Sequence, residues 1–357
     1  MGTRHAKLAP PNLTSDTMRL TYHTFDLQLK HTFTIAHDSR DVQQTLIVQL
    51  NDGVYSGFGE ATSNPYYGIT LRNMIGTLDM VKDIVEKGKY SSAEELWTMV
   101  HPLLRDNSFA QCALDEAAQD YFAKKKGQKL YESWGLSPDP IPMTNFTIGI
   151  DTVEKMVEKM RELPWPIYKI KLGTSEDLRI VQELRKNTDA LFRVDANCGW
   201  TAEKTIEIAP QLAALGVEFI EQPLPADDIE GMKRVFAASA LPVIADESCI
   251  VEDDVEQCHG LFHGINVKLT KCGGPTAALR MIAQARSLGM KTMVGCMTET
   301  SVGISAIAHL LPLLDYVDMD GSLLIRNDPA TGVTFDFGRV IYAGGNGTGA
   351  ALKPEFL

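Results

Sequence analysis

The amino-acid sequence predicts an α/β protein in two parts: a small α+β unit followed by a (β/α)7β TIM-like barrel. The first observation is a change of pattern. Extended and then helical segments fill the first 135 residues, whereas strand-like runs alternate with helical stretches from about residue 142. The second observation is that there are eight such runs, the number that closes a (β/α) barrel. The third is that ionisable residues recur at the ends of these runs.

The N-terminal unit opens with strands and ends with helices. "MRLTYHTFDLQL" and "TLIVQL" are extended segments, and "NDG" before "VYSGFGEA" predicts a hairpin because Asp-Gly favours a tight turn between apolar runs. Three helical patterns follow: "LRNMIGTLDMVKDIVEKG", "SAEELWTMVHPLL" and "FAQCALDEAAQDYFAKKKG". The last ends in a glycine after a basic turn, a helix stop signal. We place this unit at residues 18–140, after a loosely ordered leader at residues 1–17 that lacks the apolar core of a signal peptide.

The barrel is predicted over residues 141–324. Seven helical stretches, such as "TVEKMVEKMRELP", separate eight strand-like runs, which predicts βα units with right-handed crossovers. The runs are "MTNFTIG", "IYKIKLG", "ALFRVDANCGW", "VEFIEQPLP", "LPVIADES", "GINVKLTKCGG", "MKTMVGCM" and "DYVDMDG". No helix follows the eighth run, so the tail, about residues 325–357, is free to return to the N-terminal unit. The alternative topology is an open, doubly wound sheet.

Composition narrows the classes of function. The formal net charge of −12 makes a nucleic-acid-binding surface an unfavoured first choice. No run approaches 18 apolar residues, so no membrane span is expected. The six cysteines are scattered without a C-x-x-C pair, which favours reduced thiols and a cytoplasmic location.

Charged residues close most of the predicted barrel strands. Lys171, Asp195, Glu221, Asp246 and Lys268 follow one another at intervals of 24, 26, 25 and 22 residues, about one βα repeat each. Because adjacent strands lie about 4.8 Å apart, the three carboxylates should converge on one point, with the two lysines facing each other across it. Side chains alternate along a strand, so Lys169 should point to the same interior as Lys171.

Three converging carboxylates require a compensating cation, because mutual repulsion would otherwise partly neutralise them. A set of oxygen ligands without histidine or cysteine favours Mg2+, with Mn2+ as an alternative. Such an ion would bind a substrate carboxylate and stabilise the enediolate formed when the α-proton is removed. Lys171 and Lys268, with pKa values lowered by the dication and partial burial, would be two bases on opposite faces of one carbon, which permits racemisation or epimerisation. The alternative is that these lysines and carboxylates form an ion-pair network with a purely structural role.

At these residues the chain resembles the enolase superfamily, in its muconate-lactonizing-enzyme subgroup. The matching elements are K-x-K at Lys169–Lys171, D-x-N at Asp195–Asn197, "EQPLP" at Glu221, "ADES" at Asp246 and "NVKLTKCGG" at Lys268. The resemblance implies that the α+β unit is a capping domain, that Mg2+ is the cofactor and that the protein is a homo-oligomer. Lys or His bases with Mg2+ are a general feature of enolase-superfamily sites.

The eighth strand helps to choose among the reactions of this subgroup. "DMDG" puts Asp318 and Asp320 on one face, where they would suit a cationic α-ammonium better than a succinyl group. D-x-D at this place resembles the dipeptide epimerases, including the L-Ala-D/L-Glu epimerases. The same resemblance implies five substrate neighbours at strand ends: Thr147, Lys169, Asn197, Cys296 and Thr298.

Two segments of the capping domain, residues 30–41 and 62–70, would bind the side chain of the epimerised residue. In the L-Ala-D/L-Glu epimerases an arginine in the first loop binds the glutamate. An ungapped count puts Asp38 at that place, which leaves Arg40 and His37 as candidates. Tyr66 and Tyr67 are candidates to line the pocket for this side chain.

These observations predict an Mg2+-dependent dipeptide epimerase, an isomerase that inverts the α-carbon of the C-terminal residue by a two-base proton transfer. Its partner would be a small dipeptide, with no nucleic acid and no membrane. Two alternatives within the subgroup are an N-succinylamino-acid racemase and an o-succinylbenzoate-synthase-like enzyme. An alternative of a different class is a catalytically silent barrel that acts as a binding protein.

Overall fold

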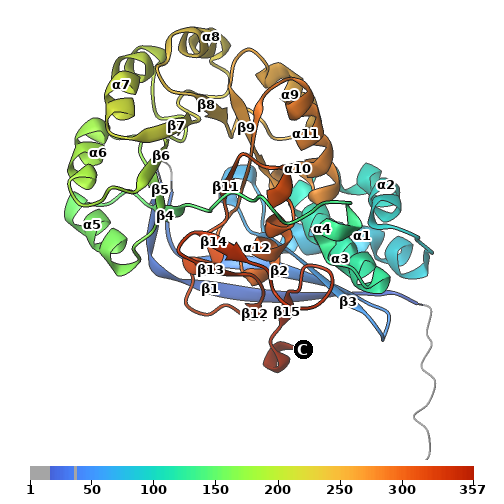
Figure 1. Ribbon diagram of the computed structural model, residues 1–357. Helices are drawn as coiled ribbons and strands as arrows, with labels where there is room; N and C mark the ends of the chain where they lie inside the picture. The colour runs from blue at the N-terminus through green and yellow to red at the C-terminus, as the bar shows by residue number, and fades with distance from the viewer. Residues whose placement is uncertain (1–16, 36–37) are drawn as a thin grey trace, which may run out of the picture.

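The computed structural model describes residues 17–35 and 38–357 of the chain. Figure 1 shows a ring of helices around a central parallel sheet, with the N-terminal strands β1 to β3 in blue along one side of it. Helices α1 to α4 lie next to these strands, and the red C-terminal segments run beside β1, with which the tail forms backbone hydrogen bonds. In the described part of the chain, no helix is long and apolar enough to cross a bilayer.

The N-terminal strands form an antiparallel sheet in the order β1-β2-β3. They span Arg19–Ile35, Asp38–Asn51 and Ser56–Thr62. The hairpin predicted at "NDG" is confirmed. Gly53 there has φ 87°, and Asp52 Oδ1 accepts hydrogen bonds from the backbone N–H groups of Val54 and Tyr55 at 2.8 and 2.7 Å. The side chain of Asp52 thus closes the loop that sets the register of β2 and β3.

Helices α1 (Leu71–Lys87), α2 (Ala93–Leu104), α3 (Ser108–Lys126) and α4 (Leu130–Ser133) complete this unit. The three helices predicted from the sequence correspond to the first three of these. Helix α3 is buried on every face from Phe109 to Ala123 because it lies between the sheet and the barrel. Gly57 and Gly59 let it approach β3 closely, since a Cβ at either position would lie about 2 Å from a carbonyl oxygen of α3, 2.1 and 2.2 Å respectively.

The barrel prediction is confirmed, and the open-sheet alternative is wrong. Eight parallel strands pair in strictly sequential order from β4 to β11, and a parallel bridge between Thr144 and Val317 brings the two edges together. The strands are β4 (Phe146–Ile148), β5 (Ile167–Lys171), β6 (Leu191–Asp195), β7 (Val217–Glu221), β8 (Val243–Ala245), β9 (Gly264–Lys268), β10 (Lys291–Gly295) and β11 (Tyr316–Asp318).

Helices fill each of the seven connections between these strands. They are α5 (Val153–Glu162), α6 (Asp177–Arg185), α7 (Ala202–Ala214), α8 (Ile229–Ala238), α9 (Glu252–Cys258), α10 (Leu269–Cys272), α11 (Pro275–Ser287) and α12 (Ser301–Ala308). The main apolar core lies between this helical layer and the strands; on β5, Tyr168 and Ile170 belong to it. The other face of each strand therefore points into the barrel interior.

After β11 the tail contains only short elements and contacts the N-terminal unit in several places. The backbone of Leu324 and Arg326 hydrogen-bonds to β1 at Lys30 and Gln28, each at 2.8 Å. The short elements are η3 (Gly321–Leu323), β12 (Ala330–Thr331), β13 (Thr334–Asp336), β14 (Arg339–Ile341), β15 (Ala351–Leu352) and η4 (Pro354–Phe356). Further along, Gly347 exchanges backbone hydrogen bonds with Gln128 and Leu130, which flank the start of α4.

Candidate active site

The lysines of β5 point into the barrel, as their alternation with Tyr168 and Ile170 predicts. Lys169 is 1% exposed and Lys171 is 8% exposed. Strand register places Lys171 beside Asp195 of β6, and Asp195 beside Glu221 of β7. The three residues thus lie at one height at the carboxyl end of the barrel, where barrel enzymes carry their chemistry.

Three carboxylates meet beneath this end of the barrel. Asp195 and Glu221 close their strands, Asp246 follows β8, and one oxygen of each lies within 4.8 Å of the others. All three are buried, at 0, 0 and 1% exposure. The donors are oxygen atoms only and can be bridged by one ion, which fits a hard dication such as Mg2+.

Lys169 pairs with two of these carboxylates and with Asp318, while Lys171 Nζ lies 2.6 Å from Asp195 Oδ2. The Nζ of Lys169 lies 3.1 Å from Asp195, 2.8 Å from Glu221 and 2.8 Å from Asp318. Burial alone would lower the pKa of Lys169, but Asp318, Glu221 and Asp195 outweigh burial and hold it well above its usual value. Lys169 is therefore a fixed cation that binds the third, fourth and eighth barrel strands together.

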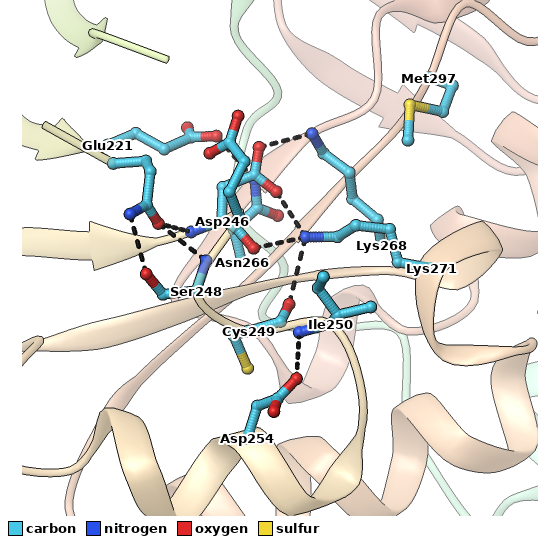
Figure 2. Close-up of polar contacts among 12 residues, drawn as sticks. Glu221, Asp246, Ser248, Cys249, Ile250, Asp254, Asn266, Lys268, Lys271 and Met297 are labelled. Carbon is cyan, nitrogen blue, oxygen red and sulfur yellow. Dashed lines mark hydrogen bonds and ion pairs between the residues drawn. The ribbon is translucent and has the colours of Figure 1, made fainter. Parts of the chain in front are cut away.

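Asp246 is paired with two lysines (Figure 2). Lys268 Nζ lies 2.6 Å from Asp246 Oδ2, and Lys271 Nζ lies 2.6 Å from Oδ1. Lys271 also donates to the backbone carbonyls of Asp246 and Cys249, at 2.5 and 3.1 Å. It is 1% exposed, so all of its donors are used inside the protein. Asp246 is thus held in one orientation from below by Lys271 while Lys268 reaches it from the cavity side.

The protein groups around Lys268 act on the pKa of its ammonium in two opposing ways. Burial would lower the pKa of its ammonium, but the charge of Asp246 more than offsets burial and raises that pKa well above the usual value. For Asp246, burial raises the carboxyl pKa, and Lys268 with Lys271 outweigh it and bring that pKa well below the usual range. The lowered lysine pKa that a two-base mechanism needs therefore does not come from the protein groups around Lys268.

Above these charges lies a cavity of about 370 Å³. Every predicted catalytic and substrate-binding residue lines it: Lys169, Lys171, Lys268, Thr147, Asn197, Cys296, Thr298, Asp318 and Asp320. The metal-ligand candidates lie directly below, within reach of the lining lysines. The barrel thus brings the whole predicted set to one place.

The capping unit supplies the outer wall of the cavity. Arg40 and Tyr66 line it, as predicted, and Tyr67 does so as well. The side chain of Arg40 donates a hydrogen bond to Gln43 Oε1. His37 lies outside the described residues. Phe33, Thr62, Asn64 and Pro65 also line the cavity and lie within the predicted segments 30–41 and 62–70, although the sequence singled none of them out. The sequence did not point to Met297, which follows β10, or to Leu324, which follows β11, and both line the cavity as well.

Asp318 and Asp320 differ in their partners. Asp318 accepts from Lys169 Nζ at 2.8 Å and from Asn145 Nδ2 at 2.7 Å, whereas Asp320 Oδ2 accepts the backbone N–H of Thr147 at 2.5 Å. Burial raises the pKa of Asp318, but Lys169 more than offsets it, so the net pKa is lowered. Burial and the neighbouring Asp318 raise the pKa of Asp320 to about 7. A cationic group placed beside Asp320 would relieve this repulsion.

Four residues that hold the charged side chains of the site in place were not predicted from the sequence. Besides Lys271 and Asn145, Asn266 Nδ2 donates to Glu221 Oε1 at 2.9 Å. Gln222 Oε1 accepts from the backbone N–H groups of Asp246 and Ser248 at 2.9 and 3.1 Å, which fixes the turn after β8. Gln222 lies within the "EQPLP" motif, and Lys271 lies one helical turn after Lys268. Both could therefore have been found as polar residues that are close in sequence to the predicted charged residues.

Two lysines four strands apart across three buried carboxylates, under an α+β unit, define an enolase-type barrel enzyme architecture. Sequence comparison agrees: residues 151–355 match the family described as Enolase C-terminal domain-like, and residues 19–135 match the Mandelate racemase / muconate lactonizing enzyme N-terminal domain. The chain belongs to this enolase-superfamily family, which confirms the resemblance inferred from its motifs.

Several relatives carry more specific descriptions. The L-Ala-D/L-amino acid epimerase of Flavobacterium johnsoniae is 58% identical over 335 residues, covering 94% of this chain and all of the relative. The substrate-liganded complex of the L-Ala-D/L-Glu epimerase from Bacillus subtilis superposes with a TM-score of 0.88 at 27% identity, covering 94% of this chain and 99% of that one. The dipeptide epimerase from Methylococcus capsulatus, complexed with Mg and L-Arg-D-Lys, superposes with a TM-score of 0.86 at 29% identity and the same coverage.

Proposed function

We propose that this protein is an Mg2+-dependent dipeptide epimerase that inverts the α-carbon of the C-terminal residue. The observation that carries the proposal is the placement of Lys171 and Lys268. Strands β5 and β9 are four apart in an eight-stranded barrel, so the two ammonium groups approach one cavity from opposite sides. A carbon held between them can lose a proton to one side and regain one from the other, which inverts its configuration.

The metal would be held by Asp195, Glu221 and Asp246, the set that fits a hard cation. When bound, Mg2+ supplies Lewis acidity, which stabilises the negative charge that develops on a substrate carboxylate as the α-proton leaves. Asp246, the main partner of Lys268 in the structure, would share its negative charge with that cation and so hold the Lys268 proton less strongly. This supports a role for Lys268 as a base.

The chain's own residues divide the remaining work. The Nζ atoms of Lys171 and Lys268 would remove and return the α-proton, each accepting it when neutral and donating it when charged. Lys169, held by three carboxylates, stays charged and orients Glu221 and Asp318. Asp318 and Asp320 would bind the α-ammonium of the N-terminal residue, because a buried acid pair favours a cation there.

This acid pair also argues against the other reactions of the subgroup. An N-succinyl group, or the succinyl portion of o-succinylbenzoate, would place a carboxylate beside Asp318 and Asp320, where like charges repel. A catalytically silent barrel that only binds a ligand would need neither Lys171 nor Lys268 beside the metal-ligand carboxylates. The expectations of a homo-oligomer and of a cytoplasmic location stay predictions.

The test is 1H NMR of a dipeptide panel, beginning with L-Ala-L-Glu and L-Ala-L-Leu, incubated with enzyme and Mg2+ in D2O. Loss of the C-terminal α-proton signal with growth of the L,D diastereomer would support both the reaction and the carbon attacked. N-succinyl amino acids are the matched controls, and EDTA should stop the exchange. Exchange on N-succinyl substrates alone would contradict the dipeptide assignment, and no exchange on any would favour the binding-protein alternative.

A further inference from the structure

A second cavity lies directly beside the active-site cavity. It has a volume of about 190 Å³, several times the roughly 30 Å³ that one water occupies in the liquid. Phe33, Thr147 and Leu324 line both cavities, so these three residues form the wall between them. The reaction proposed above makes no use of this second space.

The inner part of the second cavity is apolar. Leu29, Phe146, Leu163 and Leu323 line it, in addition to Phe33 and Leu324 of the wall. Charged groups lie at its outer end, where His31 Nε2 contacts Glu162 at 2.8 Å and Lys159 lies nearby. A space with this lining suits an aliphatic or aromatic side chain that enters from the active-site cavity.

The dividing wall is held firmly by the backbone around it. Lys30 N–H donates to Leu324 O at 2.8 Å, and Ile150 N–H donates to Thr34 O at 3.0 Å, so β1 is tied to the tail on one side and to the segment after β4 on the other. The ring of Phe33 faces Gly149, where a Cβ would lie 3.8 Å from its Cδ2. These bonds fix the backbone positions from which the side chains of Phe33 and Leu324 extend.

The wall stands next to the acid pair. Thr147 is part of it, and its backbone N–H binds Asp320 at 2.5 Å. If Asp318 and Asp320 bind the α-ammonium of a dipeptide, the side chain of its N-terminal residue begins only two bonds from that nitrogen. That side chain would therefore lie close to Thr147, the wall residue in contact with Asp320.

We propose that Phe33 and Leu324 set the size limit for the N-terminal residue of the substrate. With both present the site takes a small N-terminal residue such as alanine, and with either shortened the second cavity takes a larger apolar one. The inference rests on the proposed function. Misfit of a single methylene in an apolar pocket changes kcat/KM by about 10- to 200-fold, so the limit should be measurable.

The test compares kcat/KM for L-Leu-L-Leu with that for L-Ala-L-Leu, measured by α-proton exchange in D2O. We expect the wild-type protein to prefer L-Ala-L-Leu, and we expect the ratio to rise by about 10-fold or more in Phe33→Ala and in Leu324→Ala. Phe33→Val is a milder variant in case either alanine variant folds poorly. An unchanged ratio in the folded variants would overturn the inference.

A control variant separates the second cavity from a general loosening of the site. Leu163 lines only the second cavity, so Leu163→Trp alone should leave the ratio unchanged, whereas Phe33→Ala/Leu163→Trp should lose the gain. A gain that persists in the double variant would exclude the second cavity as the space used. If wild-type protein with Mg2+ exchanges no dipeptide proton, the proposed function itself fails, which is a different result from an unchanged ratio.

Discussion

The two walls of the active-site cavity are built in different ways. On the barrel side, each charged residue comes from a strand in fixed register and has several partners, as Lys169 does with three carboxylates. On the cap side, Tyr66 is 66% exposed and makes an edge-on ring contact with Tyr67, with ring centroids 4.9 Å apart. We therefore expect the chemistry to lie on the rigid scaffold, and the selection of the substrate side chain to lie on segments that can change without disturbing it.

The strongest test of the barrel side removes one base at a time. We expect Lys171→Ala and Lys268→Ala each to lower the rate of epimerisation by 10³-fold or more, about the contribution of a positioned acid–base group. If the lysines serve opposite faces, each variant should still exchange the α-proton of one epimer and not of the other. NMR in D2O with L-Ala-L-Leu and L-Ala-D-Leu measures both properties.

Lys233→Ala is the matched control for these variants. Lys233 is a surface lysine, 2.6 Å from Glu230, with 56% of its side chain exposed, and its loss should leave the rate unchanged. Exchange of both epimers in either active-site variant would contradict the assignment of one base to each face.

The next test asks how rigid the barrel side is. Lys271→Met removes a buried ammonium that binds Asp246 Oδ1 and two backbone carbonyls, leaving these acceptors without it. Breaking a buried ion pair on one side costs about 3–5 kcal/mol, and we expect a loss of that order in the free energy of unfolding. Urea denaturation of the metal-free protein measures it. A loss below about 1 kcal/mol would show that Lys268 and solvent compensate fully.

A third test concerns the junction of the two walls. Glu299 follows Met297 of the cavity, accepts the Met297 N–H at 2.9 Å, and lies near Glu60 of β3. Burial and the charge of Glu60 raise the pKa of Glu299 to about 8. Because the folded state then holds a proton that the unfolded state has released, this group's stabilisation is complete below about pH 4.5 and is lost as the pH rises to about 8.

Glu299→Gln should flatten this part of the pH dependence. We expect the free energy of unfolding of the wild-type protein to fall relative to the variant by up to about 1.4 kcal/mol per pH unit between pH 4.5 and 8. Urea unfolding at pH 5, 6, 7 and 8 gives the difference. Parallel curves for the two proteins would mean that Glu299 titrates normally.

The difference between the walls also explains how far the sequence could be interpreted. Lys171, Asp195 and Lys268 were predictable because a βα repeat places one residue per strand at the same height. Phe33 lies within the predicted segment 30–41 but was not singled out, and Leu324 was not predicted, since one comes from a strand of the cap and the other from the tail, and no periodicity relates them. The close pairing of Lys268 with Asp246 at 2.6 Å could not be predicted either, because it depends on side-chain geometry rather than on residue type.

The smallest effect is expected on the cap side, at Arg40. Its side chain lines the cavity and is hydrogen-bonded to the buried Gln43, which in turn donates to the backbone carbonyl of Ser63 at 2.8 Å. A guanidinium held there would favour an acidic C-terminal residue by roughly 1.5–3 kcal/mol at most, the value of a hydrogen bond to a charged group. Arg40→Met should therefore lower kcat/KM for L-Ala-L-Glu about 10-fold relative to L-Ala-L-Leu, with Arg72→Met on the exposed start of α1 as the control. An equal effect on both dipeptides would instead make Arg40 a support of the wall, and the acidic preference would have to be sought elsewhere in residues 30–41 and 62–70.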